Sequence, residues 1–252
     1  FWASRVERNG PGKYDINKPA PIPEWQKDER KKITTNDLLH MNSGLEWEEA
    51  YDKICDATKM LFIAEDMGRV QLEKPAAFAP NTHWNYSSGT SNLLSYILRK
   101  QFKTHQEYLD FWYAQLIDRI GMHSMLIETD MVGNYVGSSY GWATARDWAK
   151  FGLLYLHKGN WNGDQVFDPS WENYVSTPTN DSKEGYGAHF WLNAGGHFPA
   201  APRDMYSCNG YQGQKVFIIP SLDLVIVRMG LSDEGKYDVN ELLAGVIGSF
   251  KK

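Results

Sequence analysis

The last third of the chain contains the pattern that most restricts its fold. Residues 215–219 and 224–228 are two runs rich in β-branched side chains, and Pro220 and Asp223 lie in the turn between them. This pattern predicts an antiparallel hairpin. Residues 238–250 then place apolar side chains at helical spacing on one face, as in a helix that packs on a sheet. The chain must therefore build a sheet that a C-terminal helix covers.

Residues 224–227 are apolar without interruption. Such a run is typical of a strand that is covered on both faces and flanked on both sides. Only two neighbours for it are obvious in the sequence, and an unpaired apolar strand edge promotes aggregation. We therefore expect a strand that pairs with residues 224–227 to be absent from this chain.

The middle of the chain has helical spacing of its apolar residues, interrupted by polar loops. We predict one α+β domain over residues 1–252, with a mainly helical region at 14–183 and a sheet-associated region formed by 1–13 and 184–252. The predicted helices cover residues 1–10, 35–41 with Thr35 as the cap, 46–60, 91–100 with Ser91 as the cap, 104–121 with a capping box at Thr104, and 144–159 with Thr144 at its start.

Charge and composition exclude several classes of function. The net charge is −5 and no long basic run is present, so nothing indicates a nucleic-acid partner. No apolar stretch reaches the length of a membrane span. Cys55, Cys208 and the histidines show no metal-ligand spacing, so we expect neither a metal nor another cofactor. The expected partner is a small-molecule substrate.

Three segments carry residues that suit catalysis: residues 33–45, which end in Ser-Gly-Leu, residues 84–92, which contain Tyr-Ser-Ser, and residues 208–220, which begin Cys-Asn-Gly-Tyr. Taken singly, each has an ordinary structural explanation. A Tyr-Ser-Ser stretch before a helix is more often a packed tyrosine with capping serines, and paired glycines before a hairpin commonly mark a tight turn or bulge.

With these three segments in this order, the chain resembles the serine β-lactamase and penicillin-binding-protein superfamily, especially the esterases and amidases related to class C β-lactamases. The resemblance implies a β-lactamase/transpeptidase-like fold and a serine hydrolase that forms an acyl-enzyme on an ester, amide or β-lactam. It gives Tyr86 the proton-transfer role, and it gives Ser88 a hydrogen bond to a lysine or to the substrate amide. A phenol with a pKa near 10 needs such a cation beside it to act as a base at neutral pH.

The same resemblance assigns the substrate and oxyanion contacts. Asn209 and Gly210 fall on the family's substrate-binding strand, and the Tyr211 N–H would be one oxyanion donor. Trp142 could touch the substrate, although a core position is the commoner role for such a tryptophan. Cys208 replaces the Lys or His that binds the carboxylate of penicillins, which favours an esterase, amidase or peptidase-like relative. Arg203 or Lys215 could supply a cation instead.

The family's Ser-x-x-Lys tetrad has no suitable match here. The single literal match, Ser249 to Lys252, lies at the tail, where the chain order does not fit. We expect the nucleophile, its lysine and the first strands of the sheet to lie on a missing N-terminal segment, and this chain alone to be inactive. The alternatives are a catalytically silent fragment or binding remnant of that family and a two-chain product of cleavage. Relatives are usually exported, so we expect a periplasmic or exported protein.

Overall fold

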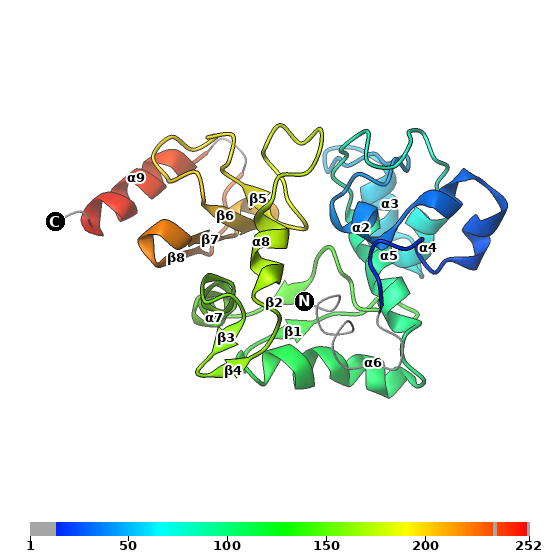
Figure 1. Ribbon diagram of the computed structural model, residues 1–252, viewed down its shortest axis with the longest axis horizontal. Helices are drawn as coiled ribbons and strands as arrows, with labels where there is room; N and C mark the ends of the chain where they lie inside the picture. The colour runs from blue at the N-terminus through cyan, green and yellow to red at the C-terminus, as the bar shows by residue number, and fades with distance from the viewer. Residues whose placement is uncertain (1–13, 234–235, 251–252) are drawn as a thin grey trace. The chain divides into compact units, whose positions relative to one another are not determined.

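The structure is a computed structural model that describes residues 14–233 and 236–250 (Figure 1). The helix predicted over residues 1–10 lies outside the described residues. The chain divides into two compact units. The first contains the described residues up to Arg119 together with Ser124–Trp142, and the second contains Ile120–His123 and the residues from Ala143 onward.

The first unit is mainly helical and is built around α5 (Ser88–Arg99). Helices α2, α3, α4 and α6 all contact α5. Leu93, Ile97 and Leu98 of α5 are almost fully buried because they share its inner face. The other elements of this unit are η1 (Pro23–Lys27), η2 (Glu29–Lys32), α2 (Thr35–Leu39), α3 (Asp56–Phe62), α4 (Met67–Leu72), α6 (His105–Trp112), η3 (Tyr113–Ile117), β1 (Leu126–Ile127) and β2 (Gly141–Trp142).

The second unit contains a four-stranded antiparallel sheet in the order β5-β6-β7-β8. Its strands are β5 (Trp191–Leu192), β6 (Tyr206–Asn209), β7 (Lys215–Ile219) and β8 (Leu224–Arg228). Phe217, Ile219 and Ile226 pack against Leu243 and Ile247 of α9 (Val239–Phe250). Helix α7 (Ala145–Leu156) contacts both β7 and β8. The remaining elements are β3 (Asn160–Trp161), β4 (Asp164–Gln165), α8 (Ser170–Ser176), η4 (Tyr211–Gly213) and η5 (Pro220–Leu222).

The opposite face of β8 meets α7 at a glycine. A side chain added at Gly152 would lie 2.6 Å from Val225 Cγ1 and 3.1 Å from Val216 Cγ1. Because α7 and α9 contact alternate residues of the strand, β8 is covered on both faces, as its apolar composition predicts. Within residues 14–233 and 236–250, β8 hydrogen-bonds to β7 and to no other strand. Its second edge is therefore one of the two open edges of the described sheet, the other being that of β5.

Several sequence predictions are confirmed. The hairpin pairs Lys215 with Arg228 and Ile219 with Leu224, and the C-terminal helix begins and ends within one residue of the predicted range. Thr104 and Glu107 form the predicted capping box, although the α-helix ends at Trp112 and continues as a π-helical turn to Ile117. Thr144 caps α7 through the Asp147 N–H.

Other predictions are wrong. Residues 46–55 are not helical, and α3 begins only at Asp56. Helix α5 is capped by Ser87, four residues before the predicted Ser91, so Ser91 lies inside it. Thr34 rather than Thr35 caps α2, because Thr34 and Asp37 form a capping box. No described helix is both long enough and apolar enough to cross a bilayer.

Replacing Leu243 by alanine is expected to lower the free energy of unfolding by about 3 kcal/mol, because it leaves a cavity between α9 and the sheet. The Leu243 side chain is 0% exposed. Its neighbour Leu242 is only half-buried and lies outside that cluster, so Leu242→Ala is the matched control, with an expected loss of about 1 kcal/mol. Urea unfolding followed by tryptophan fluorescence measures both. Equal losses would contradict the packing of α9 through Leu243.

Candidate functional site

Tyr86 lies immediately before the N-terminus of α5. The Ser87 hydroxyl accepts a hydrogen bond from the Thr90 N–H at 3.0 Å and so caps the helix. Ser88 is the first helical residue and its side chain is buried. Because Ser87 is the cap, Tyr86 lies just outside the helix and Ser88 lies in its first turn. The Tyr-Ser-Ser motif therefore caps the helix through Ser87. It also places the Tyr86 phenol and the Ser88 hydroxyl at the N-terminus of α5.

The segment that leads to Tyr86 is held by the turn at Ser43 and Gly44. The Gly44 carbonyl accepts the N–H groups of Ala77 at 2.8 Å and Phe78 at 3.0 Å. Farther along, the Asn85 N–H donates to the Met41 carbonyl at 2.9 Å. Gly44 has a φ of +79°, and a Cβ there would lie 2.1 Å from the Phe78 oxygen. This position therefore requires glycine both for its backbone conformation and for the close approach of the segment.

The carboxylate of Glu49 lies against the first turn of α5. The Ser88 N–H donates to Glu49 Oε2 at 2.9 Å, and the Ser88 hydroxyl donates to Glu49 Oε1 at 2.5 Å. Trp47 Nε1 donates to Oε2 at 2.5 Å. The Tyr51 hydroxyl donates to Oε1 at 2.5 Å. A negative charge at a helix N-terminus is favourable because the helix dipole is positive there. We call Trp47, Glu49, Tyr51, Tyr86 and Ser88 the Glu49 cluster.

Burial and the Glu49 charge raise the pKa of Tyr86 to about 12. Burial is the larger cause, because it disfavours the phenolate. The pKa of Tyr51 is also raised, by burial and by its hydrogen bond to Glu49. Both phenols are therefore protonated at neutral pH in the described structure. Tyr86 can act as a base only if a cation lowers its pKa.

Glu49 and Tyr51 were missed in the sequence because residues 46–60 were predicted to form a helix. In the structure residues 46–50 form no regular element and residues 51–55 bend before α3 begins at Asp56, and Glu46 donates its N–H to the Pro75 carbonyl at 3.0 Å. Trp47 and Tyr51, two residues to either side of Glu49, both donate to its carboxylate. The Trp47-x-Glu49-x-Tyr51 spacing was the available signal.

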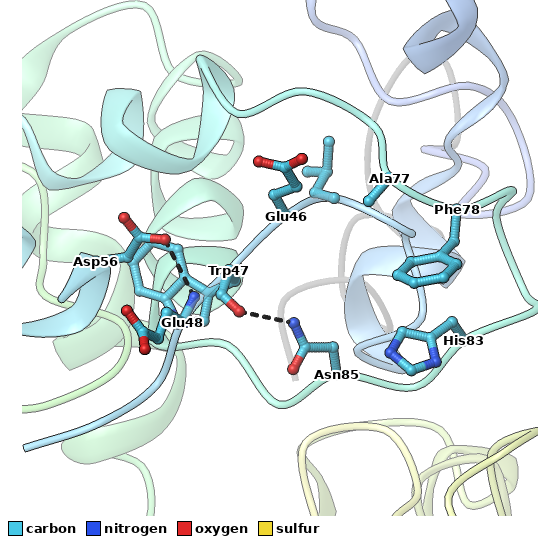
Figure 2. A pocket seen from close by; sticks show the side chains of 9 residues that line it. Glu46, Trp47, Glu48, Asp56, Ala77, Phe78, His83 and Asn85 are labelled. Carbon is cyan, nitrogen blue, oxygen red and sulfur yellow. Dashed lines mark hydrogen bonds between the residues drawn. The ribbon is translucent and has the colours of Figure 1, made fainter.

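An open pocket of about 460 Å³ adjoins the Glu49 cluster through Trp47 (Figure 2). Phe78 and His83 line one side with their ring centroids 4.2 Å apart, and Asn85 Nδ2 donates to the Trp47 carbonyl at 3.1 Å. None of the residues predicted to bind substrate lines it. Within residues 14–233 and 236–250, no three His, Cys, Asp or Glu side chains gather as a metal site would require.

Trp142 belongs to the first unit, in the short β1–β2 hairpin, where it pairs with Leu126. Its side chain is 56% exposed, and Nε1 donates to Glu128 Oε1 at 2.6 Å. The commoner explanation, a core tryptophan, is therefore wrong for this residue. The contact of Trp142 with a substrate stays a prediction.

Asn209, Gly210 and Tyr211 lie in the second unit, where β6 ends and the η4 turn begins. Gly210 is extended, and its N–H donates to the Gln214 carbonyl at 2.8 Å. A Cβ at Gly210 would lie 2.8 Å from Gln214 Cβ, which explains the glycine by local packing. The Tyr211 side chain is 67% exposed. We call residues 209–213 the β6–β7 corner.

The residue before the corner carries no charge at neutral pH. Burial raises the pKa of the Cys208 thiol to about 12. Lys215 pairs with Asn209 across the β6–β7 ladder, so a cation is present on the neighbouring strand. Arg203, the other cation considered, donates to the Ala194 carbonyl at 2.8 Å.

Arg228, the last residue of β8, hydrogen-bonds to the β6–β7 corner. Its Nη1 donates to the Gly213 carbonyl at 2.8 Å, and its guanidinium lies 4.0 Å from the centre of the Tyr237 ring. Gln214, which follows the corner, is joined to the residues after β8, because its Nε2 donates to the Gly230 carbonyl at 2.6 Å. The structure thus groups Tyr86 with Ser88 in the first unit and Asn209 with Gly210 and Tyr211 in the second.

One family model covers most of the chain, and several solved structures share its fold. The family model described as Beta-lactamase matches residues 8–242. A Bacillus anthracis structure provisionally described as a 6-aminohexanoate-dimer hydrolase is 21% identical with a TM-score of 0.72, and the match covers 93% of this chain and 64% of that one. A class C beta-lactamase is 14% identical with a TM-score of 0.65, over 99% of this chain and 77% of that one. A family VIII carboxylesterase is 14% identical with a TM-score of 0.64, over 93% and 76%.

These likenesses confirm the predicted α+β, β-lactamase/transpeptidase-like fold. A curated relative, the kojibiose hydrolase of Mucilaginibacter mallensis, is 48% identical over 42 residues, which is 17% of this chain and 6% of that protein. The chain therefore spans less than two thirds of the Bacillus anthracis protein and a small part of the Mucilaginibacter protein.

Proposed function

Because this chain belongs to the beta-lactamase family, we propose that it is most of a serine hydrolase whose nucleophilic serine and lysine lie outside these 252 residues. The reaction is acyl transfer to water through a serine ester, on an ester, amide or β-lactam. The observation that carries the proposal is the Tyr86 phenol before α5, with the Ser88 hydroxyl and the Glu49 carboxylate in one cluster.

In this proposal the residues of the chain divide the work. Tyr86 transfers the proton between the attacking oxygen and the leaving group, which requires a cation because its pKa is otherwise about 12. Ser88 holds that cation or the substrate amide. In the second unit, the β6–β7 corner supplies the Tyr211 N–H to the developing oxyanion. Trp142 and Asn209 contact the substrate.

The neutral thiol of Cys208 favours ester and amide substrates over penicillins. The position that would attract a penicillin carboxylate carries no charge at neutral pH, since burial raises the thiol pKa to about 12. The described functions of two structural neighbours, a 6-aminohexanoate-dimer hydrolase and a carboxylesterase, agree with amide and ester chemistry. We therefore propose an uncharged ester or amide at this side of the acyl group.

Intact-mass measurement after incubation with a fluorophosphonate and with a fluorescent penicillin tests the missing nucleophile. The 252-residue chain is expected to gain no adduct. A polypeptide that also includes whatever its gene encodes ahead of Phe1 is expected to gain one serine adduct and to hydrolyse a chromogenic ester. An adduct on the 252-residue chain would place the nucleophile among these residues and overturn the proposal. Absence of any adduct on both would leave a silent binding remnant of the family.

A further inference from the structure

The carboxylate of Glu49 is fully hydrogen-bonded. Oε1 accepts from the hydroxyls of Ser88 and Tyr51, and Oε2 accepts from Trp47 Nε1 and the Ser88 N–H. A carboxylate offers about four acceptor positions, so these four donors fill it. Trp47 is itself fixed, because its ring packs on Gly89, where a Cβ would lie 2.6 Å from the indole. Glu49 therefore serves to orient its neighbours and is not directed at a ligand of its own.

The consequence lies in the direction of two hydroxyl protons. Each hydroxyl has one proton to donate, and those of Ser88 and Tyr51 are both given to Glu49 Oε1. The two oxygens also lie 3.3 Å apart, a longer contact in which either could donate, but the 2.5 Å bonds to the carboxylate take both protons. Each hydroxyl therefore offers lone pairs to any further group. A pair of acceptor oxygens backed by a carboxylate attracts cations and N–H donors and repels anions.

We propose that Glu49 is a positioning residue of the acyl-transfer site, which turns the hydroxyls of Ser88 and Tyr51 into acceptors for an ammonium or N–H group beside the Tyr86 phenol. This inference rests on the proposed function. Among the described residues, the Glu49 carboxylate is the charged group that raises the pKa of Tyr86, and Tyr86 in turn raises the pKa of Tyr51. Two nearby lysines are paired with other carboxylates, since Lys53 pairs with Glu48 and Lys74 pairs with Asp56.

An ammonium received there would have two effects. It would balance the Glu49 charge, and it would lower the pKa of Tyr86, because an opposite charge within a few ångströms favours the phenolate. Glu49 thus makes the phenol a poor base until a cation arrives. Tyr86 therefore becomes an effective base only when an ammonium is bound at the Ser88 and Tyr51 hydroxyls.

Glu49→Gln is the informative variant because glutamine cannot satisfy all four donors. Its single oxygen is needed at Trp47 Nε1 and the Ser88 N–H, which can only donate. Its NH₂ then faces the hydroxyls of Ser88 and Tyr51, which must turn around and accept. Their protons point outward as a result. The substitution removes the charge and reverses the polarity of the site with little change in shape.

The test uses the 252-residue chain with 3-fluorotyrosine in place of tyrosine, which makes the phenols more acidic and allows 19F NMR titration. Tyr86→Phe assigns the signal. Glu49→Gln is expected to raise the acid dissociation constant of Tyr86 about tenfold, the effect of removing one neighbouring charge. Glu48→Gln is the matched control, because Glu48 is the adjacent carboxylate but is exposed and paired with Lys53. It is expected to leave the Tyr86 pKa unchanged.

Guanidinium chloride at low concentration, compared with sodium chloride at equal ionic strength, probes the polarity directly, because guanidinium stays charged at the alkaline pH at which Tyr86 titrates, whereas a primary ammonium does not. It is expected to lower the Tyr86 pKa in the unsubstituted chain and in Glu48→Gln but not in Glu49→Gln. At neutral pH, the short O–H to carboxylate bonds should give downfield proton signals that disappear in Glu49→Gln. An equal response to guanidinium in Glu49→Gln, or retained downfield signals, would overturn the inference.

Two further points keep the test decisive. Circular dichroism checks that Glu49→Gln is folded. If it is not, Ser88→Ala with Tyr51→Phe removes both acceptor oxygens while leaving the carboxylate, and it is expected to abolish the guanidinium response. Retention of that response in the double variant would overturn the inference. None of these measurements needs turnover. A chain that never forms an acyl-enzyme would contradict the proposed function and leave this result intact.

Discussion

Gly44→Ala is expected to lower the free energy of unfolding by about 4 kcal/mol, near the upper end of single substitutions. Two causes add. A non-glycine residue at a φ of +79° costs about 1–2 kcal/mol. The new Cβ would also lie 2.1 Å from the Phe78 carbonyl oxygen, and backbone cannot move aside as a flexible side chain does. The midpoint of thermal unfolding is expected to fall by about 10 °C or more.

Gly163→Ala is the matched control for the backbone cost. Gly163 has a φ of +90°, and nothing lies within 4 Å of a Cβ built there. This variant is therefore expected to lose only about 1 kcal/mol. Urea unfolding followed by tryptophan fluorescence compares the two. Equal losses would show that the contact between Gly44 and Phe78 does not constrain the chain.

Tyr86→Phe is expected to reduce kcat for ester hydrolysis by about 10²- to 10⁴-fold in the active polypeptide, the usual contribution of a general acid–base group. The substitution removes one oxygen and keeps the ring. KM should change little, since the phenol moves a proton during reaction rather than contributing equally to ground-state binding. Steady-state kinetics with a chromogenic ester measure both constants.

Tyr96→Phe controls for loss of a phenol in the same unit. Tyr96 lies on α5 with Lys100 Nζ 4.9 Å from its ring centre, a contact that phenylalanine keeps. Its kcat is expected to stay close to that of the unsubstituted enzyme. If Tyr86→Phe retains full kcat, the proton-transfer role of Tyr86 is refuted.

The sequence predicted those parts of the fold that have strong local signals. The hairpin around Pro220 and Asp223 has two runs rich in β-branched residues separated by a turn, and α9 has an apolar stripe along its whole length. The caps at Thr104 and Thr144 were identified because each hydroxyl lies three residues before the residue whose N–H it accepts. The two-residue strands carry no comparable signal, because they are defined by their partners.

The error at residues 46–60 has a physical reason. Several of these residues have good helix propensity, yet propensity is worth only tenths of a kcal/mol per residue and yields to tertiary contacts. Glu46 and Leu45 are bound to the segment near Ala76, and Glu49 reaches the first turn of α5. The same error concealed the Glu49 cluster. Tyr86 and Ser88 could be predicted from their motif. Glu49 and Tyr51 could be placed in the cluster only once residues 46–55 were known not to be helical.

Arg228 links two parts of the second unit that have been described separately. It ends β8, the strand with an open edge in the described sheet, and its guanidinium holds the Gly213 carbonyl of the β6–β7 corner. A strand that docked along β8 would restrict the backbone from which this arginine projects. The Tyr211 N–H, the proposed oxyanion donor, would then be rigid only in the assembled sheet. Docking of a strand on β8 would then both complete the sheet and order the β6–β7 corner.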